Sequence, residues 1–262
     1  MPRPSNKLLL WPGEALAAKG YVARQIHLHL AREIEKVDLS NGMPAGWSSD
    51  ALAPGKWEVR DDALWGYCEP QNSTILWRRQ DMPANFAIEF KAAAMPTHDK
   101  PIATATRIGE INAFWNGTGD ATKEDFRATV GSLGGWYAGF CGIEHLKGAG
   151  GAQSDGTYLS REIDLAPQRP YNIVAGRYDD TDFFFVNGSA ASQATTALEV
   201  GAGKLVGLAT FADEDIAALV RFWDIRMVEL TDESIVPLSA SGLRHPGQSP
   251  GRLGPRKSAT EE

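Results

Sequence analysis

Apolar and polar residues alternate with a period of two along most of the chain, which is typical of β-strands with one face against a core. Phe86, Ile88 and Phe90 alternate with Glu89 and Lys91. These residues belong to a predicted strand within Asn85–Met95, and further strands are predicted within Lys56–Glu69, Ser73–Gln80, Tyr171–Tyr178, Asp182–Gly188, Lys204–Phe211 and Ala218–Leu230.

Turn signals separate these strands at intervals of about ten residues. Asp61-Asp62 predicts the turn of a hairpin within Lys56–Glu69, and Asn187-Gly188 predicts a type I′ turn, whose two positions both need a positive φ. The alternation of strands and helices that an α/β fold requires is missing. The sequence therefore predicts an all-β protein, an antiparallel β-sandwich of the jelly-roll type.

The two ends of the chain differ from its middle. Ala23–Lys36 has the pattern of an amphipathic helix, but its first half alternates as a strand does, so both interpretations stay open. We expect an N-terminal extension over residues 1–36 and a sandwich domain over 37–232. Residues 233–262 are rich in Gly, Pro and Ser, and we expect a disordered tail there because so few apolar residues cannot offset the chain entropy.

The composition of the chain limits which kinds of molecule the protein is expected to bind. The 262 residues suit one sandwich domain, and 43% of them are hydrophobic. A net charge of −7 argues against a broad surface for nucleic acid. The sequence contains no apolar run of about 18 residues, so we expect no membrane span. The apolar run at Leu8–Leu10 is too short for a signal peptide, and we expect a cytoplasmic protein.

Cysteine and acidic residues give little sign of a metal site. Cys68 and Cys141 match no zinc motif, can form at most one disulfide, and are expected to be buried free thiols. Asp224 stands alone as a carboxylate, whereas calcium needs six or more oxygen ligands. We expect no metal-binding residues and no cofactor, with a structural calcium ion as the one option left open.

The stretch "RIGEINAFWNGTGD" combines polar side chains with a large aromatic surface. A strand from Arg107 to Trp115 would project Glu110 and Asn112 side by side from one face of a sheet. Carboxylates and amides bind sugar hydroxyls, and an aromatic ring such as that of Trp115 packs on the apolar face of a sugar. In the alternative interpretation, Asn112 satisfies backbone groups in a purely structural strand, and Asn116-Gly117 is its turn.

The glycine-rich run Gly131–Gly151 holds the best candidates for proton transfer. His145 titrates near neutrality, and Tyr137 can donate a proton to a leaving glycosidic oxygen. A lone histidine is more often structural, and Trp136 in the same run fits core packing as well as a sugar-stacking role. No nucleotide-binding loop and no Gly-x-Ser-x-Gly motif is present.

Two arginines could neutralise the carboxylate of a uronic acid. Arg107 lies at the start of the polar-aromatic strand, and Arg127 lies in "EDFRATV". In a β-eliminating lyase such neutralisation acidifies the proton next to the carboxylate. Either arginine could equally be an ordinary surface charge.

Several segments together resemble concanavalin-A-like jelly-roll proteins. These are "GMPAGW", "GKWEVRDDALWG", "STILWRR" and "NFAIEFKA", followed later by "RPYNIVAGRYDDTDFFFVNG", "GKLVGLATF" and "VRFWDIRMVEL". The resemblance spans Val37–Leu230, and "GEINAFWNGTG" is similar to a segment of uncharacterised bacterial families associated with polysaccharide degradation. Glu110 stands where those relatives carry aspartate. The Glu-x-Asp-x-x-Glu strand of laminarinase-type jelly rolls is missing, so no retaining two-carboxylate mechanism is carried over.

The resulting hypothesis is a carbohydrate-active protein whose concave sheet binds a plant-type, uronate-containing oligosaccharide or polysaccharide and cleaves it as a lyase or hydrolase. Tyr137 and His145 would transfer protons. The expected substrate-binding residues are Arg107, Glu110, Asn112, Trp115, Arg127 and Trp136. The alternative is a non-catalytic carbohydrate-binding module, and a third class is a structural or partner-binding sandwich.

Overall fold

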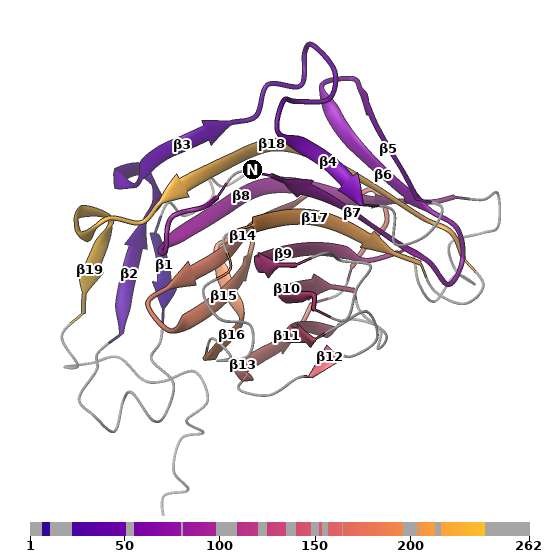
Figure 1. The fold of residues 1–262 in the computed structure, drawn as a ribbon. Helices are drawn as coiled ribbons and strands as arrows, with labels where there is room; N and C mark the ends of the chain where they lie inside the picture. Colours follow the sequence, from indigo (N-terminus) through magenta and orange to yellow (C-terminus); the bar gives the residue numbers. More distant parts are fainter. Residues whose placement is uncertain are drawn as a thin grey trace, which may run out of the picture.

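The computed structural model describes residues 7–10, 23–50, 55–79, 81–97, 109–119, 125–134, 140–147, 152–153, 157–163, 165–195, 203, 205–212 and 216–238. One antiparallel ladder of 16 strands folds over on itself to form two layers (Figure 1). The two layers are joined where β11 pairs with β13. Among the described residues no helix is long and apolar enough to cross a bilayer.

The first layer, named the front sheet, has the strand order β4-β7-β17-β9-β10-β11, with β12 beside β11. Its strands are β4 (Trp47–Asp50), β7 (Ser73–Arg78), β9 (Ile111–Thr118), β10 (Arg127–Leu133), β11 (Phe140–Lys147), β12 (Ala152–Gln153) and β17 (Leu205–Phe211).

The second layer, named the back sheet, has the order β13-β16-β15-β14-β8-β18-β6-β5, with β3 beside β18. Its strands are β3 (Arg32–Lys36), β5 (Gly55–Arg60), β6 (Ala63–Cys68), β8 (Phe86–Met95), β13 (Thr157–Glu162), β14 (Tyr171–Tyr178), β15 (Thr181–Val186), β16 (Ser189–Thr195) and β18 (Ala218–Glu229).

The alternation of residues determines which face of each strand enters the core between the sheets. Phe86, Ile88 and Phe90 are buried together there, as their spacing predicts. Both predicted hairpin turns are also confirmed, because the two residues of Asp61-Asp62 and of Asn187-Gly188 all have positive φ. The predicted all-β sandwich is therefore confirmed, and β5 to β8, β14, β15, β17 and β18 begin or end within a few residues of the predicted ranges, whereas β16 lies outside them.

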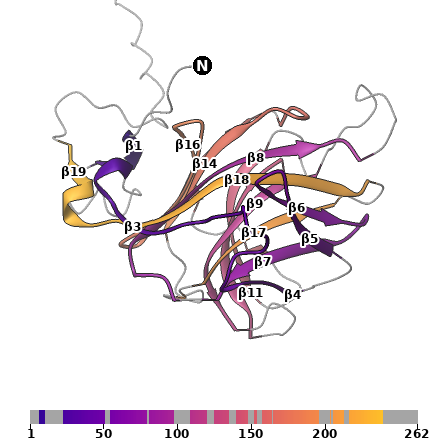
Figure 2. The same ribbon diagram turned by 90° about the horizontal axis from the view of Figure 1, so that it is seen from above.

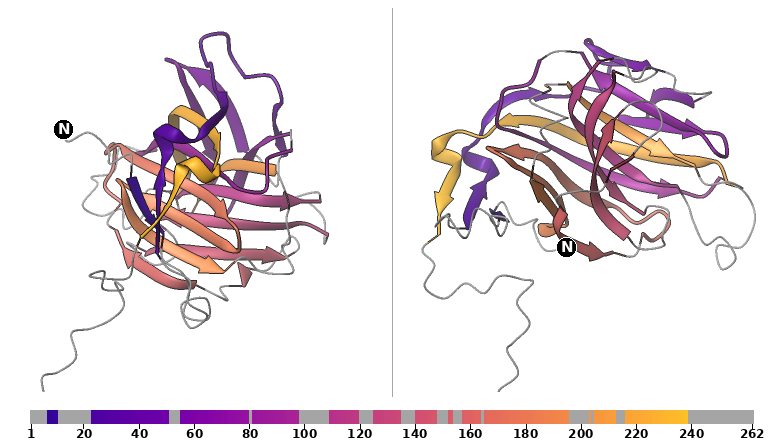
Figure 3. Two further views of the ribbon diagram at one scale, coloured as in Figure 1. Left: turned by 90° about the vertical axis from the view of Figure 1, so that its left-hand side faces the viewer. Right: turned by 60° about the horizontal axis from the view of Figure 1, so that its bottom comes forward.

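The N-terminal segment forms strands that are part of the fold. The predicted amphipathic helix over Ala23–Lys36 is not formed: the segment forms β2 (Arg24–His27), a 3₁₀ turn (Leu28–Leu30) and β3. The strand interpretation of its first half holds for Ile26 and His27 but not for Leu28–Leu30. β1 (Lys7–Leu10), β2 and β19 (Ile235–Pro237) make a small second sheet. This small sheet lies beside the back sheet (Figure 3, left). Its buried residues pack against Phe183 and Phe185, which belong to a second hydrophobic cluster and not to the main core.

At the C-terminal end, ordered secondary structure continues beyond residue 232, where the sequence predicts that the disordered tail follows. Residues predicted as the start of the disordered tail form a 3₁₀ turn, Asp232–Ser234, and the strand β19. Ile235 is buried against the second cluster, which explains why this short apolar run is ordered. The remainder of the predicted tail, residues 239–262, lies outside the described residues.

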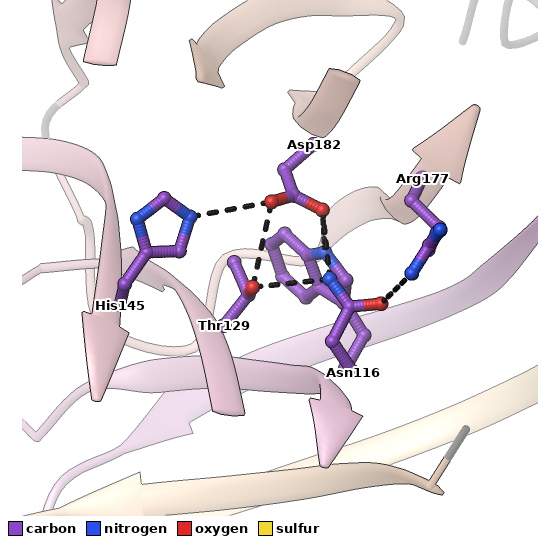
Figure 4. A network of polar contacts seen from close by, with 6 residues as sticks. Asn116, Thr129, His145, Arg177 and Asp182 are labelled. Carbon is purple, nitrogen blue, oxygen red and sulfur yellow. Dashed lines mark hydrogen bonds and ion pairs between the residues drawn. The ribbon is translucent and has the colours of Figure 1, made fainter. Parts of the chain in front are cut away.

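A buried hydrogen-bond network joins the two sheets at one end of the core (Figure 4). The fully buried carboxylate of Asp182 on β15 accepts hydrogen bonds from Trp115 Nε1 at 2.7 Å, Asn116 Nδ2 at 3.0 Å and Thr129 Oγ1 at 3.4 Å. His145 Nε2 on β11 lies 3.2 Å from the same carboxylate. A carboxylate buried without such partners would cost several kcal/mol, so these contacts are what allow Asp182 to occupy the core.

Asn116 takes part in this network because β9 contains a bulge. Its φ is +56°, and the register with β10 shifts after Trp115, so two consecutive side chains of β9 reach the core. The Asn116 amide then hydrogen-bonds to two charged side chains: its Oδ1 accepts from Arg177 Nη1 at 3.0 Å, while its Nδ2 donates to Asp182. Bulges of this kind bend a strand and re-aim its side chains.

We expect Asp182→Asn to lower the free energy of unfolding by about 3–5 kcal/mol, since it removes the central acceptor of a buried network. Thr129→Val, which removes one long hydrogen bond at 3.4 Å, is expected to cost about 1 kcal/mol. Urea denaturation of the two variants tests this order. Equal losses would show that the carboxylate is not the organising group.

Ile26→Ala is expected to destabilise the protein by about 2–5 kcal/mol, because Ile26 is fully buried between the small sheet and the back sheet. Val236→Ala in the neighbouring strand is the control, since Val236 is 38% exposed and its loss should change stability by less than about 0.5 kcal/mol. Thermal and urea unfolding give the comparison. Similar small effects for both variants would mean that the small sheet does not support the sandwich.

Candidate functional site

Glu110 and Asn112 lie side by side on the outer face of the front sheet. Ile111 and Ala113 of the same strand are in the core, so the alternate positions point away from it. Asn112 Nδ2 donates to Glu110 Oε2 at 3.4 Å. The predicted adjacency of the two side chains is confirmed, but their exposure differs: Asn112 is fully buried, while Glu110 is half-buried.

Asn112 is surrounded by small residues on the neighbouring strands. Ala209 of β17 and Ser132 of β10 stand opposite it in the register, and Gly142 of β11 stands opposite Ser132. Ser132 and Glu144 share this outer face and are both half-buried. We name the set Glu110, Asn112, Ser132 and Glu144 the front polar patch.

The side-chain oxygen of Asn112 has no hydrogen-bond partner among the described residues. Buried amide oxygens are nearly always paired in folded proteins, since an orphaned acceptor costs about 1–3 kcal/mol. Its amide nitrogen already donates a hydrogen bond to Glu110, and its oxygen can accept a hydrogen bond from another group. A hydroxyl group of a bound molecule would supply such a donor.

Glu144 reaches the same face from β11, opposite Val130. Burial raises the pKa of the Glu144 carboxyl above its ordinary value, because the surrounding protein removes water from the charged form. A carboxylate that has lost part of its hydration gains more from a donated hydrogen bond than one in bulk water.

Four aromatic rings pack against one another beside the front polar patch. Trp77 contacts Phe114 and Phe126 edge-on, with ring centres 5.6 Å and 5.9 Å apart, and Phe114 contacts Phe211 in the same way at 6.0 Å. Trp77, Phe114 and Phe126 are buried, so they hold the strands in place rather than offer a surface for stacking.

Two residues expected at the site lie behind the sheet instead. Trp115 is fully buried in the main core with its indole N–H bonded to Asp182, so its ring offers no face to a sugar. His145 is also on the inner face of the front sheet, whereas Glu144 next to it is on the outer face. The proton-transfer candidate is thus separated from the front polar patch by the sheet itself.

The other expected residues are placed as follows. Arg127 is half-buried and donates from Nη1 to the backbone carbonyl of Phe126 at 2.6 Å. Arg107, Trp136 and Tyr137 lie outside the described residues. Ser132 and Glu144 were not among the predicted site residues, although alternation along β10 and β11 could have placed them opposite the Asn112 strand.

Cys68 is a buried free thiol, as predicted, and burial raises its pKa to about 12. The side chain of Cys141 lies outside the described part of the structure. Asp224, considered for calcium, has a φ of +51° at a bulge and pairs with Lys91 Nζ at 2.6 Å. Within the described ranges no group of three or more His, Cys, Asp or Glu side chains could hold a metal ion.

No protein-family model matches the sequence, and a search among curated proteins finds no match. Solved structures do resemble the fold. The carbohydrate-binding module CBM66 from Bacillus subtilis has a TM-score of 0.51 and 9% identity, over 70% of this chain and 96% of that one. The potassium-bound carbohydrate recognition domain of Emp46p has a TM-score of 0.51 and 10% identity, over 77% and 96%.

A β-glucanase from Bacillus licheniformis is similar to the same extent, with a TM-score of 0.50 and 11% identity over 73% of this chain and 96% of the enzyme. A second Bacillus subtilis structure, of a protein of unknown function with a galectin-like fold, has a TM-score of 0.50 and 10% identity. At such identities the comparisons establish the jelly-roll fold, which binding modules and enzymes share.

Proposed function

We propose that the protein binds an oligosaccharide through the front polar patch. The observation that carries this proposal is the orphaned, buried side-chain oxygen of Asn112 beside the half-buried Glu110 carboxylate, on the outer face of the front sheet. Sugar hydroxyls donate to amide and carboxylate oxygens, and the patch offers three such groups within one sheet face. Carbohydrate recognition by fold neighbours, the CBM66 module and the Emp46p domain, supports the same class of ligand.

The hydroxyl groups of a neutral sugar fit this patch better than a uronate. Glu110 and Glu144 are both acidic, and a carboxylate on either side chain would repel a ligand carboxylate. Arg127, expected to neutralise it, is directed at the Phe126 carbonyl. The acidic part of the expected ligand therefore needs a different partner on the protein.

Binding without cleavage is the form of the proposal that the described residues support. Glu110 and Glu144 are two strands and about four residues apart in register, which places their Cα atoms roughly 17 Å apart. Carboxylate pairs that hydrolyse glycosides are separated by about 5–5.5 Å in retaining enzymes and about 6.5–9.5 Å in inverting ones. His145 lies on the other face of the sheet.

We expect Asn112→Ala to weaken oligosaccharide binding at least about tenfold, because it removes both the orphaned acceptor and the group that orients Glu110. Binding is measured by calorimetry with neutral xylan-, glucan- and galactan-derived oligosaccharides. Asn41→Ala is the matched control, since Asn41 is an exposed amide that lies on none of the strands that carry the patch. If none of the oligosaccharides binds the unmodified protein, carbohydrate recognition at this face is excluded.

Glu144→Gln is expected to weaken binding and to stabilise the protein at pH 7. Burial raises the folded-state pKa of Glu144, so ionisation costs stability as pH rises above about 4.5, and glutamine avoids that cost. Below about pH 4 the carboxyl is neutral in both states, and the advantage should disappear. Unfolding at pH 3.5 and pH 7 measures this difference. A purely structural Glu144 would instead give a less stable variant at pH 7.

A further inference from the structure

A second surface with a different chemistry lies on the outer face of the back sheet. β5, β6 and β18 form it at the end of the sheet far from the small N-terminal sheet (Figures 1 and 2). Arg60, Trp65, Arg221 and Trp223 all point away from the core on these strands, since Val59, Leu64 and Phe222 beside them point inward. We name these four residues the back arginine platform.

Indole rings hold both guanidinium groups of the platform. Arg60 Cζ lies 3.9 Å from the ring centre of Trp65. Arg221 Cζ lies 4.8 Å from the Trp223 ring and 5.8 Å from the Trp65 ring. Trp65 is fixed in turn by a hydrogen bond from its Nε1 to the backbone carbonyl of Arg60 at 3.2 Å. Two cations thus share one indole, which limits their motion before any ligand arrives.

The charge of this surface is only partly compensated. Arg60 pairs with Glu58 at 3.3 Å, but both side chains are at least half exposed, and such pairs contribute little. Arg221 donates to the backbone carbonyl of Asp61 at 3.4 Å, its Nε is buried with no acceptor, and no carboxylate among the described residues pairs with it. Arg60 on β5 and Arg221 on β18 come from the two strands that flank β6 and its Trp65, so both add positive charge to one surface, where a bound anion would be stabilised.

A planar carboxylate suits this arrangement. A guanidinium that lies against an aromatic ring keeps its edge N–H groups for bidentate hydrogen bonds to carboxylate oxygens. Tyr67 on β6 and Leu219 on β18 are paired two positions along from Trp65 and Arg221 on the same face. Both side chains are half-exposed and offer apolar surface to a sugar ring. The net charge of −7 disfavours a nucleic acid, whose dense phosphates require a broad basic surface.

We propose that the back arginine platform binds the carboxylate groups of a uronate-containing oligosaccharide. This site goes beyond the proposed function, because it lies on the opposite outer face of the sandwich from the front polar patch. Arg221 and Arg60 hold the carboxylate, and the two tryptophans position the arginines. Binding here should weaken with salt, whereas binding of neutral sugars at the front patch should not.

The test measures binding of an oligogalacturonate and of its fully methyl-esterified, uncharged counterpart by calorimetry. We expect Arg221→Gln to weaken oligogalacturonate binding about tenfold and Arg221→Lys to weaken it less, since lysine keeps the charge but not the planar donors. The methyl ester should bind the platform at least about tenfold more weakly. Asn112→Ala should leave oligogalacturonate binding to the platform unchanged, which separates the two proposals.

Arg169→Gln serves as the matched control, because Arg169 is another exposed arginine over an aromatic ring, 5.4 Å from the centre of Tyr171. Circular dichroism and melting temperature establish that each variant is folded. If Arg221→Gln and Arg169→Gln affect oligogalacturonate binding equally, the platform is not the site. Tighter, Arg221-dependent binding of single-stranded DNA would also overturn the assignment to a uronate.

Discussion

The hydrogen bonds around Asp182 are the constraint on which the site geometry depends. A carboxylate in the core is tolerated only because β9, β10 and β11 each send a donor to it across the sandwich. To supply Asn116 as well as Trp115, β9 must bulge, and the bulge lies four residues beyond Asn112. The network therefore fixes the strand that carries the outward-facing amide, although none of its members reaches the outer face.

The two outer faces of the sandwich offer opposite hydrogen-bonding chemistry. The front polar patch presents acceptors, with Glu110 and Glu144 on either side of Asn112. The back arginine platform presents donors, held flat against indole rings. Under the two proposals, a neutral sugar would satisfy the first surface and a uronate the second. A heteropolysaccharide that contains both kinds of residue is the ligand class that would engage each face with its matching part.

Features that depend on residues close together in the sequence could be predicted from it. Alternation and turn signals located most strands, and the spacing of Glu110 and Asn112 predicted their adjacency correctly. Prediction from the sequence failed where contacts join distant residues: 67 positions separate Trp115 from Asp182, so nothing near either residue signals their hydrogen bond. The one local sign of the positive φ at Asn116 is the Asn116-Gly117 pair. This pair predicts a turn, but the structure has a β-bulge there.

Unsatisfied polar atoms help to separate binding surfaces from structural ones, provided that their position is considered too. Asn112 Oδ1 and Arg221 Nε both lack hydrogen-bond partners within the described part of the chain and belong to side chains on outer faces of the sheets. Arg177 Nε also lacks one, but its side chain belongs to the buried network, where no ligand enters. Both carboxylate oxygens of the buried Asp182, in contrast, have partners. A polar atom without a partner on an outer face, next to a desolvated carboxylate or a second cation, is therefore the pattern that we expect of a ligand-binding surface. The bound ligand would supply the missing hydrogen-bond partner.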